Sequence, residues 1–270
     1  MNTKIFFADL DGTLLNDQKQ ITTLTYETLR NWTEKGHKLV LCSGRALDSV
    51  IHVRETLGLG DFSNMYLIGY NGGEIYDCTT KKLLHRVALS YETTLKCFEI
   101  AKEHNIHIQT FSDTHILTEK EDAEIIYYKK AVHTPVIFTD DILHYLDKEP
   151  CKCLAISLND KELMEHFSHA VKEALGDTVN VMTSTPRFIE MFPISSGKGT
   201  SVHWLCNHLN ISPENALAAG DEMNDLSMLE AAGIGIAMKN GRDFIKEMAD
   251  IITETDNNND GLVPILKNFM

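Results

Sequence analysis

The sequence of 270 residues lacks any apolar run of about 18 residues, which is the length that a membrane-spanning helix needs. Its first apolar run stops at Asp9, too early for a secretory signal, so we expect a cytoplasmic protein with no membrane partner. Basic residues are also scarce, since 25 Lys and Arg stand against 39 Asp and Glu and the formal net charge is −14. An acidic chain of this kind argues against nucleic acid and anionic membranes as partners.

Cysteine pairs of the CxxC type are missing, and the six cysteines show no spacing typical of a disulfide framework. We therefore expect reduced, mostly buried thiols. Pro-rich linkers, internal repeats and low-complexity runs are absent as well, apart from the polar segment TDNNND, which reads as a turn. What the chain does have is 43% apolar residues, enough for a sizeable core in one large domain or two ordinary ones.

Strand-like and helix-like segments alternate at both ends of the chain. KIFFADL, HKLVLCS and MYLIGYN read as strands, separated by the helical patterns TTLTYETLRNWTEKG and RALDSVIHVRETLG, and the alternation returns from TSVHWLCNHLN onwards. The middle differs, because IHIQTFS with HILTE and VNVMTST with RFIEMF read as paired short strands between long helices. We predict an α/β doubly wound parallel-sheet (Rossmann-like) core from residues 1–82 and 192–270, and an inserted α+β domain from residues 83–191.

The first predicted strand ends in FFADLDGTLL, which places Asp9 and Asp11 one residue apart at its carboxyl end. Ligands of open α/β sheets bind at this edge, and Gly12 allows a sharp turn close to a ligand. Two carboxylates so close together repel each other unless a positive charge lies between them. A metal ion is one explanation, and a solvated Asp-Gly turn is the other.

Two further segments could bind an anion. In CSGR, the Ser43 hydroxyl and the backbone N–H groups around Gly44 precede a helix, as in a phosphate cradle, although Ser43 could also be the N-cap of that helix. Arg45 could be a surface charge. In SGKGTS, Lys198 lies between two glycines before another helix, where it could reach an anion or simply be solvated.

A second group of acidic residues follows the small apolar strand in ALAAGDEMNDLSML. Asp221 and Asp225 are four residues apart, so they can project from the same side of a helix start, or they can cap that helix. In a doubly wound fold Asp221 would reach the same sheet edge as the two aspartates of the first strand. Three carboxylates there would be costly without a divalent cation, and oxygen-only ligands favour Mg²⁺ among the common ions.

In this order, the four segments resemble the motifs of the haloacid dehalogenase superfamily of phosphatases. DLDGTL is similar to the first motif, Ser43 in CSGR to the second, Lys198 in SGKG to the third and GDEMND to the fourth. The chain also resembles the Cof-type branch of this superfamily, whose members are mostly hydrolases of sugar phosphates and other small phosphoesters. The resemblance lies in the long insert and in the segments YNGGEIYD, FIEMFPISSGKG, IAMKNG and DGL. The chain departs from that branch at Lys239 and Gly241, and its insert matches only loosely.

The resemblance implies a Mg²⁺-dependent phosphoric monoester hydrolase that acts on a small phosphorylated metabolite such as a sugar phosphate. It implies Asp9 as the nucleophile that becomes an aspartyl phosphate, and Asp11 as the general acid and base. The implied metal ligands are Asp9, Asp11, Asp221 and Glu222. The implied phosphate-binding residues are Leu10, Ser43, Gly44, Lys198 and Asn224. Further contributors would be Asp225, which would orient Lys198 or a metal-bound water, and Arg45 and Asn71.

Two other functions compete with this hypothesis. A phosphomutase of the same superfamily would return the phosphoryl group to the sugar and release no free phosphate. A phospho-acceptor signalling module of receiver type also combines acidic residues, a phosphorylated aspartate and a lysine. The length of the chain and its large insert argue against the signalling module.

Overall fold

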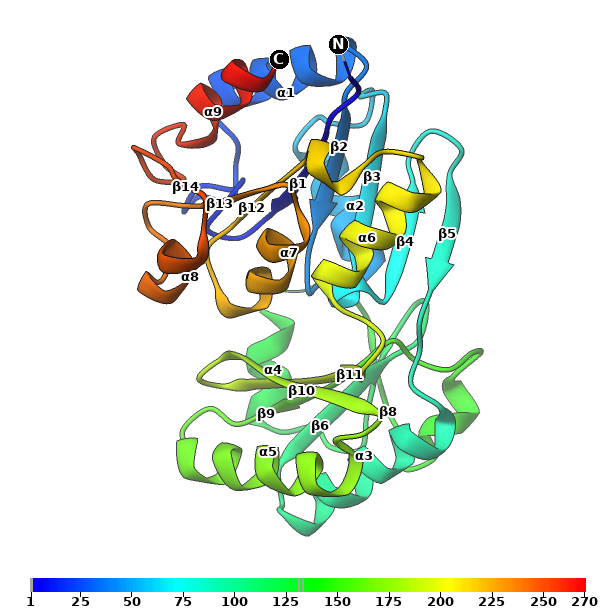
Figure 1. Ribbon diagram of the computed structural model, residues 1–270. Helices are drawn as coiled ribbons and strands as arrows, with labels where there is room; N and C mark the ends of the chain where they lie inside the picture. The colour runs from blue at the N-terminus through cyan, green and yellow to red at the C-terminus, as the bar shows by residue number, and fades with distance from the viewer. Residues whose placement is uncertain (1, 131, 133) are drawn as a thin grey trace. The chain divides into compact units, whose positions relative to one another are not determined.

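The computed structural model describes residues 2–130, 132 and 134–270. The chain forms two compact units. The first unit runs up to His85 and resumes at Ser196, and the second unit is Arg86–Ser195. Figure 1 shows both units and labels most of their helices and strands.

The first unit contains an eight-stranded sheet in the order β14-β13-β12-β1-β2-β3-β4-β5. Its strands are β1 (Ile5–Asp9), β2 (Lys38–Cys42), β3 (Met65–Gly69), β4 (Glu74–Asp77), β5 (Lys82–Arg86), β12 (Ala216–Gly220), β13 (Ile234–Ala237) and β14 (Ile251–Ile252). The pairs from β14 to β3 are parallel, and β4 pairs antiparallel to β3. The predicted α/β fold with a parallel sheet is confirmed.

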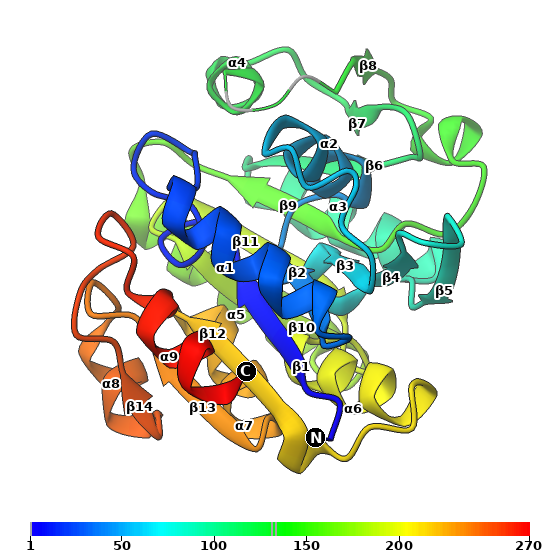
Figure 2. The ribbon, with the colours of Figure 1, turned by 90° about the horizontal axis from the view of Figure 1, so that it is seen from above.

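Helices cover both faces of this sheet. They are α1 (Thr23–Glu34), α2 (Leu47–Thr56), α6 (Lys198–His208), α7 (Leu226–Ala231), α8 (Asp243–Met248) and α9 (Leu262–Phe269). Side chains alternate along β1, so Phe6 packs in one core with α1, α2 and α9, whereas Phe7 packs in another with α6, α7 and α8. Figure 2 shows α1 and α9 side by side. A strand buried on both faces explains the uninterrupted apolar run of the sequence.

The second unit contains a six-stranded sheet in the order β10-β11-β9-β6-β7-β8. Its strands are β6 (His107–Phe111), β7 (Ile116–Thr118), β8 (Val136–Phe138), β9 (Cys153–Ile156), β10 (Val179–Thr185) and β11 (Phe188–Pro193), and its helices are α3 (Tyr91–Glu103), α4 (Ala123–Lys129) and α5 (Lys161–Leu175). The hairpins β6–β7 and β10–β11 are antiparallel, as the sequence predicts. Helices α3 and α5 share one apolar core with the sheet.

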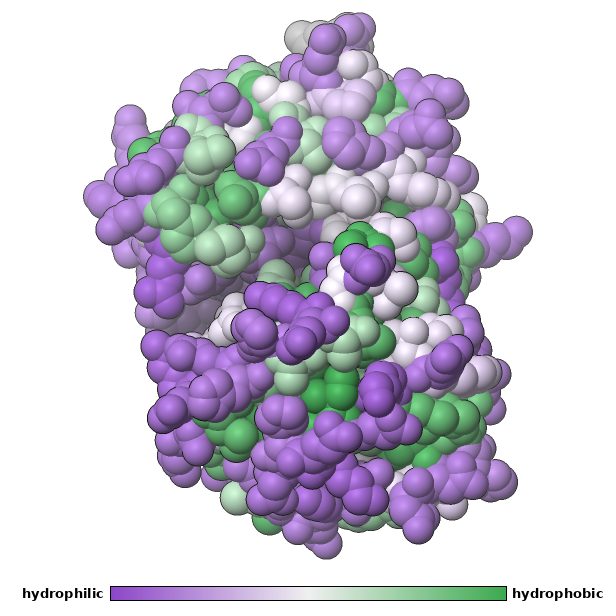
Figure 3. Space-filling model, turned by 60° about the horizontal axis from the view of Figure 1, so that its bottom comes forward, coloured by the Kyte–Doolittle hydropathy of each residue, from purple (hydrophilic) through white to green (hydrophobic). Residues whose placement is uncertain are grey.

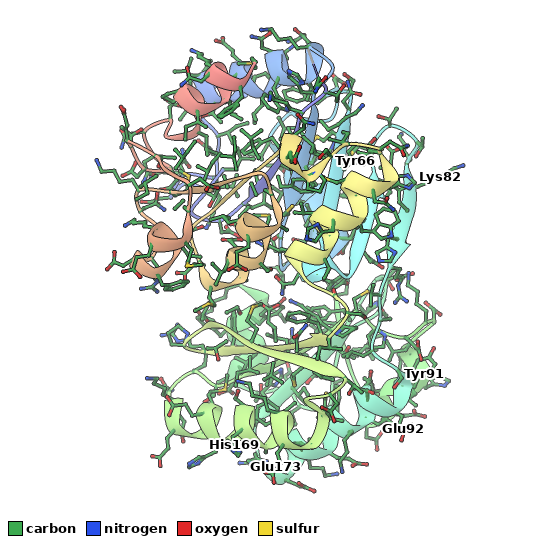
Figure 4. All side chains as sticks on the ribbon, in the orientation of Figure 1. Tyr66, Lys82, Tyr91, Glu92, His169 and Glu173 are labelled. Atoms are coloured by element: carbon green, nitrogen blue, oxygen red, sulfur yellow. The ribbon has the colours of Figure 1, made fainter. Side chains whose placement is uncertain are left out.

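A cavity of about 660 Å³ lies between α3 and α5 of the second unit. Glu92 on α3 and Glu173 on α5 line it, and Figure 4 labels both. The other lining residues include lysines and further carboxylates but no predicted site residue, so we assign no reaction to this cavity.

All six cysteines are free and buried, which agrees with the thiols expected from their spacing. Among the residues that the structure describes, no helix is both long enough and apolar enough to cross a membrane. Figure 3 shows polar side chains over most of the face in view, interrupted by smaller apolar patches.

Candidate active site

Three neighbouring strands of the first unit end in the predicted motifs. The order β12-β1-β2 brings together Asp9, the last residue of β1, Ser43, the residue after β2, and Asp221, the residue after β12. Because these strands are parallel, their carboxyl ends meet at one edge of the sheet. Segments more than 200 residues apart in the sequence therefore form one site.

Lys198 is the central cation of this site. Its Nζ donates to Asp9 Oδ1 at 2.5 Å and to Asp225 Oδ1 at 2.6 Å. The Lys198 side chain is fully buried, so the reading of Lys198 as a solvated lysine is wrong. Burial lowers the pKa of Lys198, but the two carboxylates outweigh burial and raise it, so the ammonium stays charged.

Asp225 holds the loop after β12 as well as Lys198. Its Oδ2 accepts hydrogen bonds from the backbone N–H groups of Asp221 at 3.0 Å and Glu222 at 3.1 Å. The short 3₁₀ helix η4 (Met223–Asp225) is closed by this capping box. Both carboxylate oxygens of Asp225 are thus already bonded, which makes Asp225 an anchor for Lys198 and the loop.

Asp221 faces the turn that follows β1. Its Oδ1 accepts a hydrogen bond from the Thr13 hydroxyl at 2.8 Å. Gly12 has a φ of +84°, and a Cβ there would lie only 2.4 Å from Asp221 Oδ2. Glycine is therefore needed at this position both for the backbone conformation and for the close approach of the carboxylate.

The buried carboxylates fit a divalent cation. One oxygen from each of Asp9, Asp221 and Asp225 lies within 4.8 Å of the others. Burial, followed by the charge of Asp225, raises the pKa of Asp9 well above its usual value, although Lys198 lowers it. Burial also raises the pKa of Asp221 to about 7. Three carboxylates against one ammonium leave an excess of negative charge, and oxygen-only ligands suit Mg²⁺.

The Asp11 carboxylate lies outside this cluster. Arg45 donates two hydrogen bonds to Asp11 Oδ2, from Nη2 at 2.7 Å and from Nε at 3.1 Å. Lys19 Nζ donates to Asp11 Oδ1 at 2.7 Å. Burial raises the pKa of Asp11, but Arg45 and Lys19 together hold it below its usual value. Asp11 is therefore an ionised carboxylate in this conformation, and Arg45 is more than a surface charge.

The other predicted residues occupy varied surroundings. Glu222 accepts a hydrogen bond from Arg242 Nε at 3.0 Å, so its carboxylate is engaged outside the aspartate cluster. Asn224 is partly exposed within η4, and Leu10 is fully buried. Ser43 is buried, and its Oγ accepts from the backbone N–H of Arg45 at 3.2 Å.

The alternative that Ser43 caps the next helix is wrong, because the N-cap residue of α2 is Ala46. Two further contributors, Thr13 and Lys19, were not predicted from the sequence. Thr13 belongs to the DGTL segment, so the sequence already shows a hydroxyl group two residues after Asp11 that could contact the site. Lys19 offered no such signal, because its contact with Asp11 depends on the path of the loop between them.

The chain is similar to known proteins along almost its whole length. The family model of the haloacid dehalogenase-like hydrolases matches residues 6–266. The pyridoxal phosphate phosphatase YbhA of Escherichia coli is 27% identical over 98% of both chains. The 5-amino-6-(5-phospho-D-ribitylamino)uracil phosphatase YcsE of Bacillus subtilis is 27% identical over 100% of this chain and 97% of its own. A haloacid dehalogenase-like hydrolase from Bacteroides thetaiotaomicron is 30% identical, with a TM-score of 0.89 over 100% of both chains.

Proposed function

The chain belongs to the haloacid dehalogenase-like hydrolases, and we propose that it is a Mg²⁺-dependent phosphatase for a small metabolite such as a sugar phosphate. The predicted family and the predicted enzyme class, a phosphoric monoester hydrolase, are confirmed by the family model and by relatives named as phosphatases. The metal, the substrate and the reaction intermediate belong to the proposal.

One observation carries the proposal. A buried carboxylate, Asp9, lies at the end of the central strand β1, 2.5 Å from the ammonium of Lys198 and within 4.8 Å of two more carboxylates. A buried cluster of three acidic groups with one lysine adds little to the stability of a fold, because burial disfavours their charge. Phosphoryl transfer makes use of such an arrangement, since it requires an anionic nucleophile beside a fixed cation, together with carboxylates that can hold a metal ion.

Asp9 is the proposed nucleophile. Lys198 bonds to Oδ1, so attack on phosphorus falls to Oδ2 of the same carboxylate. A bond forms between this oxygen and phosphorus while the bond from phosphorus to the leaving alkoxide breaks, which gives an aspartyl phosphate. Lys198, Asn224, the Ser43 hydroxyl and the backbone N–H groups of Leu10 and Gly44 would bind the phosphoryl oxygens, whose charge must be stabilised during transfer.

Asp11 is the proposed general acid and base. It would give a proton to the leaving alkoxide and then take a proton from the water that attacks the aspartyl phosphate. Inorganic phosphate leaves, and the Asp9 carboxylate is restored. For this step Asp11 must leave both the guanidinium of Arg45 and the ammonium of Lys19, because these contacts favour its ionised form. We propose that arrival of the substrate releases Asp11 from Arg45 and Lys19.

Asp9, Asp221 and the backbone carbonyl of Asp11 would hold Mg²⁺, with Glu222 contributing through water. The chemistry that a bound Mg²⁺ supplies is positive charge, which lets an anionic phosphate approach an ionised nucleophile. Asp225 keeps Lys198 and the loop of Asp221 in place while this happens.

The test is a panel of phosphorylated metabolites assayed for released inorganic phosphate with Mg²⁺ and with EDTA. We expect hydrolysis that EDTA abolishes and Mg²⁺ restores, together with a hydroxylamine-sensitive phosphoenzyme trapped during turnover. Sugar phosphates should rank highest by kcat/KM. Isomerised product without free phosphate would indicate a phosphomutase, and a long-lived phosphoenzyme without turnover would indicate a signalling module.

In protein freed of metal by EDTA, we expect Asp221→Asn to raise the free energy of unfolding at pH 8. Burial raises the pKa of Asp221 from 3.8 to about 7, so its charged form destabilises the fold. This penalty is absent below pH 4 and complete above pH 7, because the folded state holds its proton more tightly than the unfolded chain. The gain is at most about 4 kcal/mol, since one pKa unit corresponds to about 1.4 kcal/mol. Thermal unfolding at pH 4 and pH 8 measures it.

The same variant should lose the rise in Tm that Mg²⁺ gives to the wild type, because one ligand of the ion is gone. Asp243→Asn is the matched control, since this carboxylate is 99% exposed and its ion pair with Lys246 is long, at 3.8 Å. It should change neither Tm nor its response to Mg²⁺. An Asp221→Asn protein that Mg²⁺ stabilises as much as the wild type contradicts the metal assignment.

A further inference from the structure

The turn after β3 has an uncommon backbone. In η1 (Tyr70–Gly72) the φ angles are 53° at Tyr70, 54° at Asn71 and 103° at Gly72, so three successive residues are in the left-handed region. For a side chain such as tyrosine this region costs roughly 1–2 kcal/mol. Surrounding contacts must impose such a conformation, and strained backbone of this kind occurs at functional sites.

The turn holds the loop after β2 from one side. The backbone N–H of Asn71 donates to the Ser43 carbonyl at 3.0 Å, and the N–H of Tyr70 donates to the Arg45 carbonyl at 2.7 Å. In a trans peptide the carbonyl and the following N–H point in opposite directions. The bond to the Ser43 carbonyl therefore directs the N–H of Gly44, a proposed phosphate donor, away from the turn.

The carboxamide of Asn71 lies against Gly44 itself. Asn71 is 2% exposed, and a Cβ on Gly44 would lie 2.9 Å from Asn71 Oδ1 and 3.3 Å from Nδ2. The amide therefore fills the space that a side chain at Gly44 would need. Gly44 cannot move toward the turn, because close-packed atoms leave it no room there.

The same turn touches the lysine loop on its other side. A Cβ on Gly72 would lie 2.3 Å from the Gly197 carbonyl oxygen and 2.5 Å from Ser201 Oγ. Gly197 immediately precedes Lys198, the first residue of α6. The turn thus packs between the Ser43–Arg45 loop and the amino end of α6, which carry three of the proposed phosphate-binding residues.

We propose that Asn71 is a positioning residue for phosphate binding, which holds the Gly44 peptide at a fixed place and direction relative to Lys198. This inference rests on the proposed function and adds a residue that acts on the phosphate through Gly44. The carboxamide supplies the contact, and the left-handed turn supplies its placement. This role does not depend on the leaving group of the substrate. Loss of the Asn71 carboxamide should therefore weaken phosphate binding equally with every substrate.

The test is Asn71→Gly. Glycine adopts a φ of 54° without strain, so the turn and its backbone bonds persist while the carboxamide is removed. We expect kcat/KM to fall roughly 10-fold or more, because small displacements of binding groups are costly. The inhibition constant of inorganic phosphate should rise by a similar factor, and by the same factor whichever phosphoester is the substrate.

Asn64→Gly is the matched control at the other end of β3. Asn64 is also left-handed, with a φ of 58°, and its carboxamide bonds to Lys38 and Thr33. This variant should lower Tm but leave kcat/KM and phosphate inhibition unchanged. An Asn71→Gly protein that binds phosphate like the wild type, or that loses affinity only in step with Tm, overturns the proposal.

A double variant tests the contact directly. Gly44→Ala alone should weaken phosphate inhibition, because its Cβ would meet the Asn71 carboxamide at 2.9 Å. In the Asn71→Gly background the same Cβ enters the vacated space, so the double variant should bind phosphate better than either single variant. Additive losses contradict the contact. A wild type that neither cleaves phosphoesters nor binds phosphate would overturn the proposed function itself.

Discussion

Asp9→Asn should abolish phosphoester hydrolysis, with a fall in kcat of at least about 10⁴-fold, the size of effect seen when a catalytic nucleophile is removed. The amide has the shape of the carboxylate but lacks the negative oxygen that attacks phosphorus. Inorganic phosphate released at saturating substrate and Mg²⁺ measures the loss. No phosphoenzyme should be trapped from this variant.

The Asp9→Asn protein should stay folded, with a Tm close to that of the wild type. Burial and the neighbouring Asp225 raise the pKa of Asp9, so the ionised carboxylate is disfavoured in the fold. Its removal relieves this penalty but also weakens the contact with Lys198, and the two effects oppose each other. The change in stability is therefore small beside the change in activity.

Asp17→Asn is the control for this prediction. Asp17 is exposed in the loop that follows the same motif, so its replacement should alter neither kcat nor Tm. Hydrolysis by the Asp9→Asn protein within tenfold of the wild type would remove Asp9 from the chemistry. The proposed aspartyl phosphate would then be wrong, whichever metal or substrate is used.

The sequence predicted the fold where its patterns were periodic. The alternation of strands and helices predicted the parallel sheet, and the paired short strands predicted the hairpins of the second unit. Both patterns are visible in the sequence because they reflect which faces of each strand or helix are buried. The last strand of the alternation is short, because only Ile251–Ile252 pairs with β13. It is the edge strand β14, with a neighbour on one side only.

Strand β5 and helix α9 of the first unit were not predicted. Strand β5 has adjacent leucines, Leu83 and Leu84, instead of the alternation of a half-buried strand, so its pattern carries little signal. Helix α9 contains Pro264, which normally indicates a helix break. Pro264 is the third residue of α9, where a backbone N–H would have no partner within the helix, so the proline is tolerated.

The sequence predicted which residues form the candidate site better than it predicted which of them contact each other. Strand order explains why Asp9 and Asp221 share a sheet edge, and this follows from the predicted topology. The contact of Asp11 with Arg45 and the packing of Asn71 on Gly44 depend on loop paths and side-chain placement. No periodicity encodes these pairings, so they follow only from the three-dimensional structure.

Lys198→Met should both destabilise the protein and inactivate it. The ammonium is fully buried between Asp9 and Asp225, and methionine fills a similar volume without charge. Two carboxylates would remain buried without their cation, which costs about 3–5 kcal/mol of unfolding free energy. The lost charge at the phosphate should lower kcat/KM by at least about 10²-fold. Denaturant unfolding and phosphate release measure the two effects separately.

A double-mutant cycle with Asp9→Asn separates the ion pair from general damage. Because Lys198 Nζ lies 2.5 Å from Asp9 Oδ1, the double variant should be more stable than the sum of the single losses predicts, with a coupling above about 1 kcal/mol. Activity should not return, since both variants lack a group that the reaction needs. Lys161→Met, at a side chain 80% exposed, controls for the methionine and should be neutral. Additive losses of stability, or near-normal turnover by Lys198→Met, would contradict a lysine that links nucleophile and phosphate.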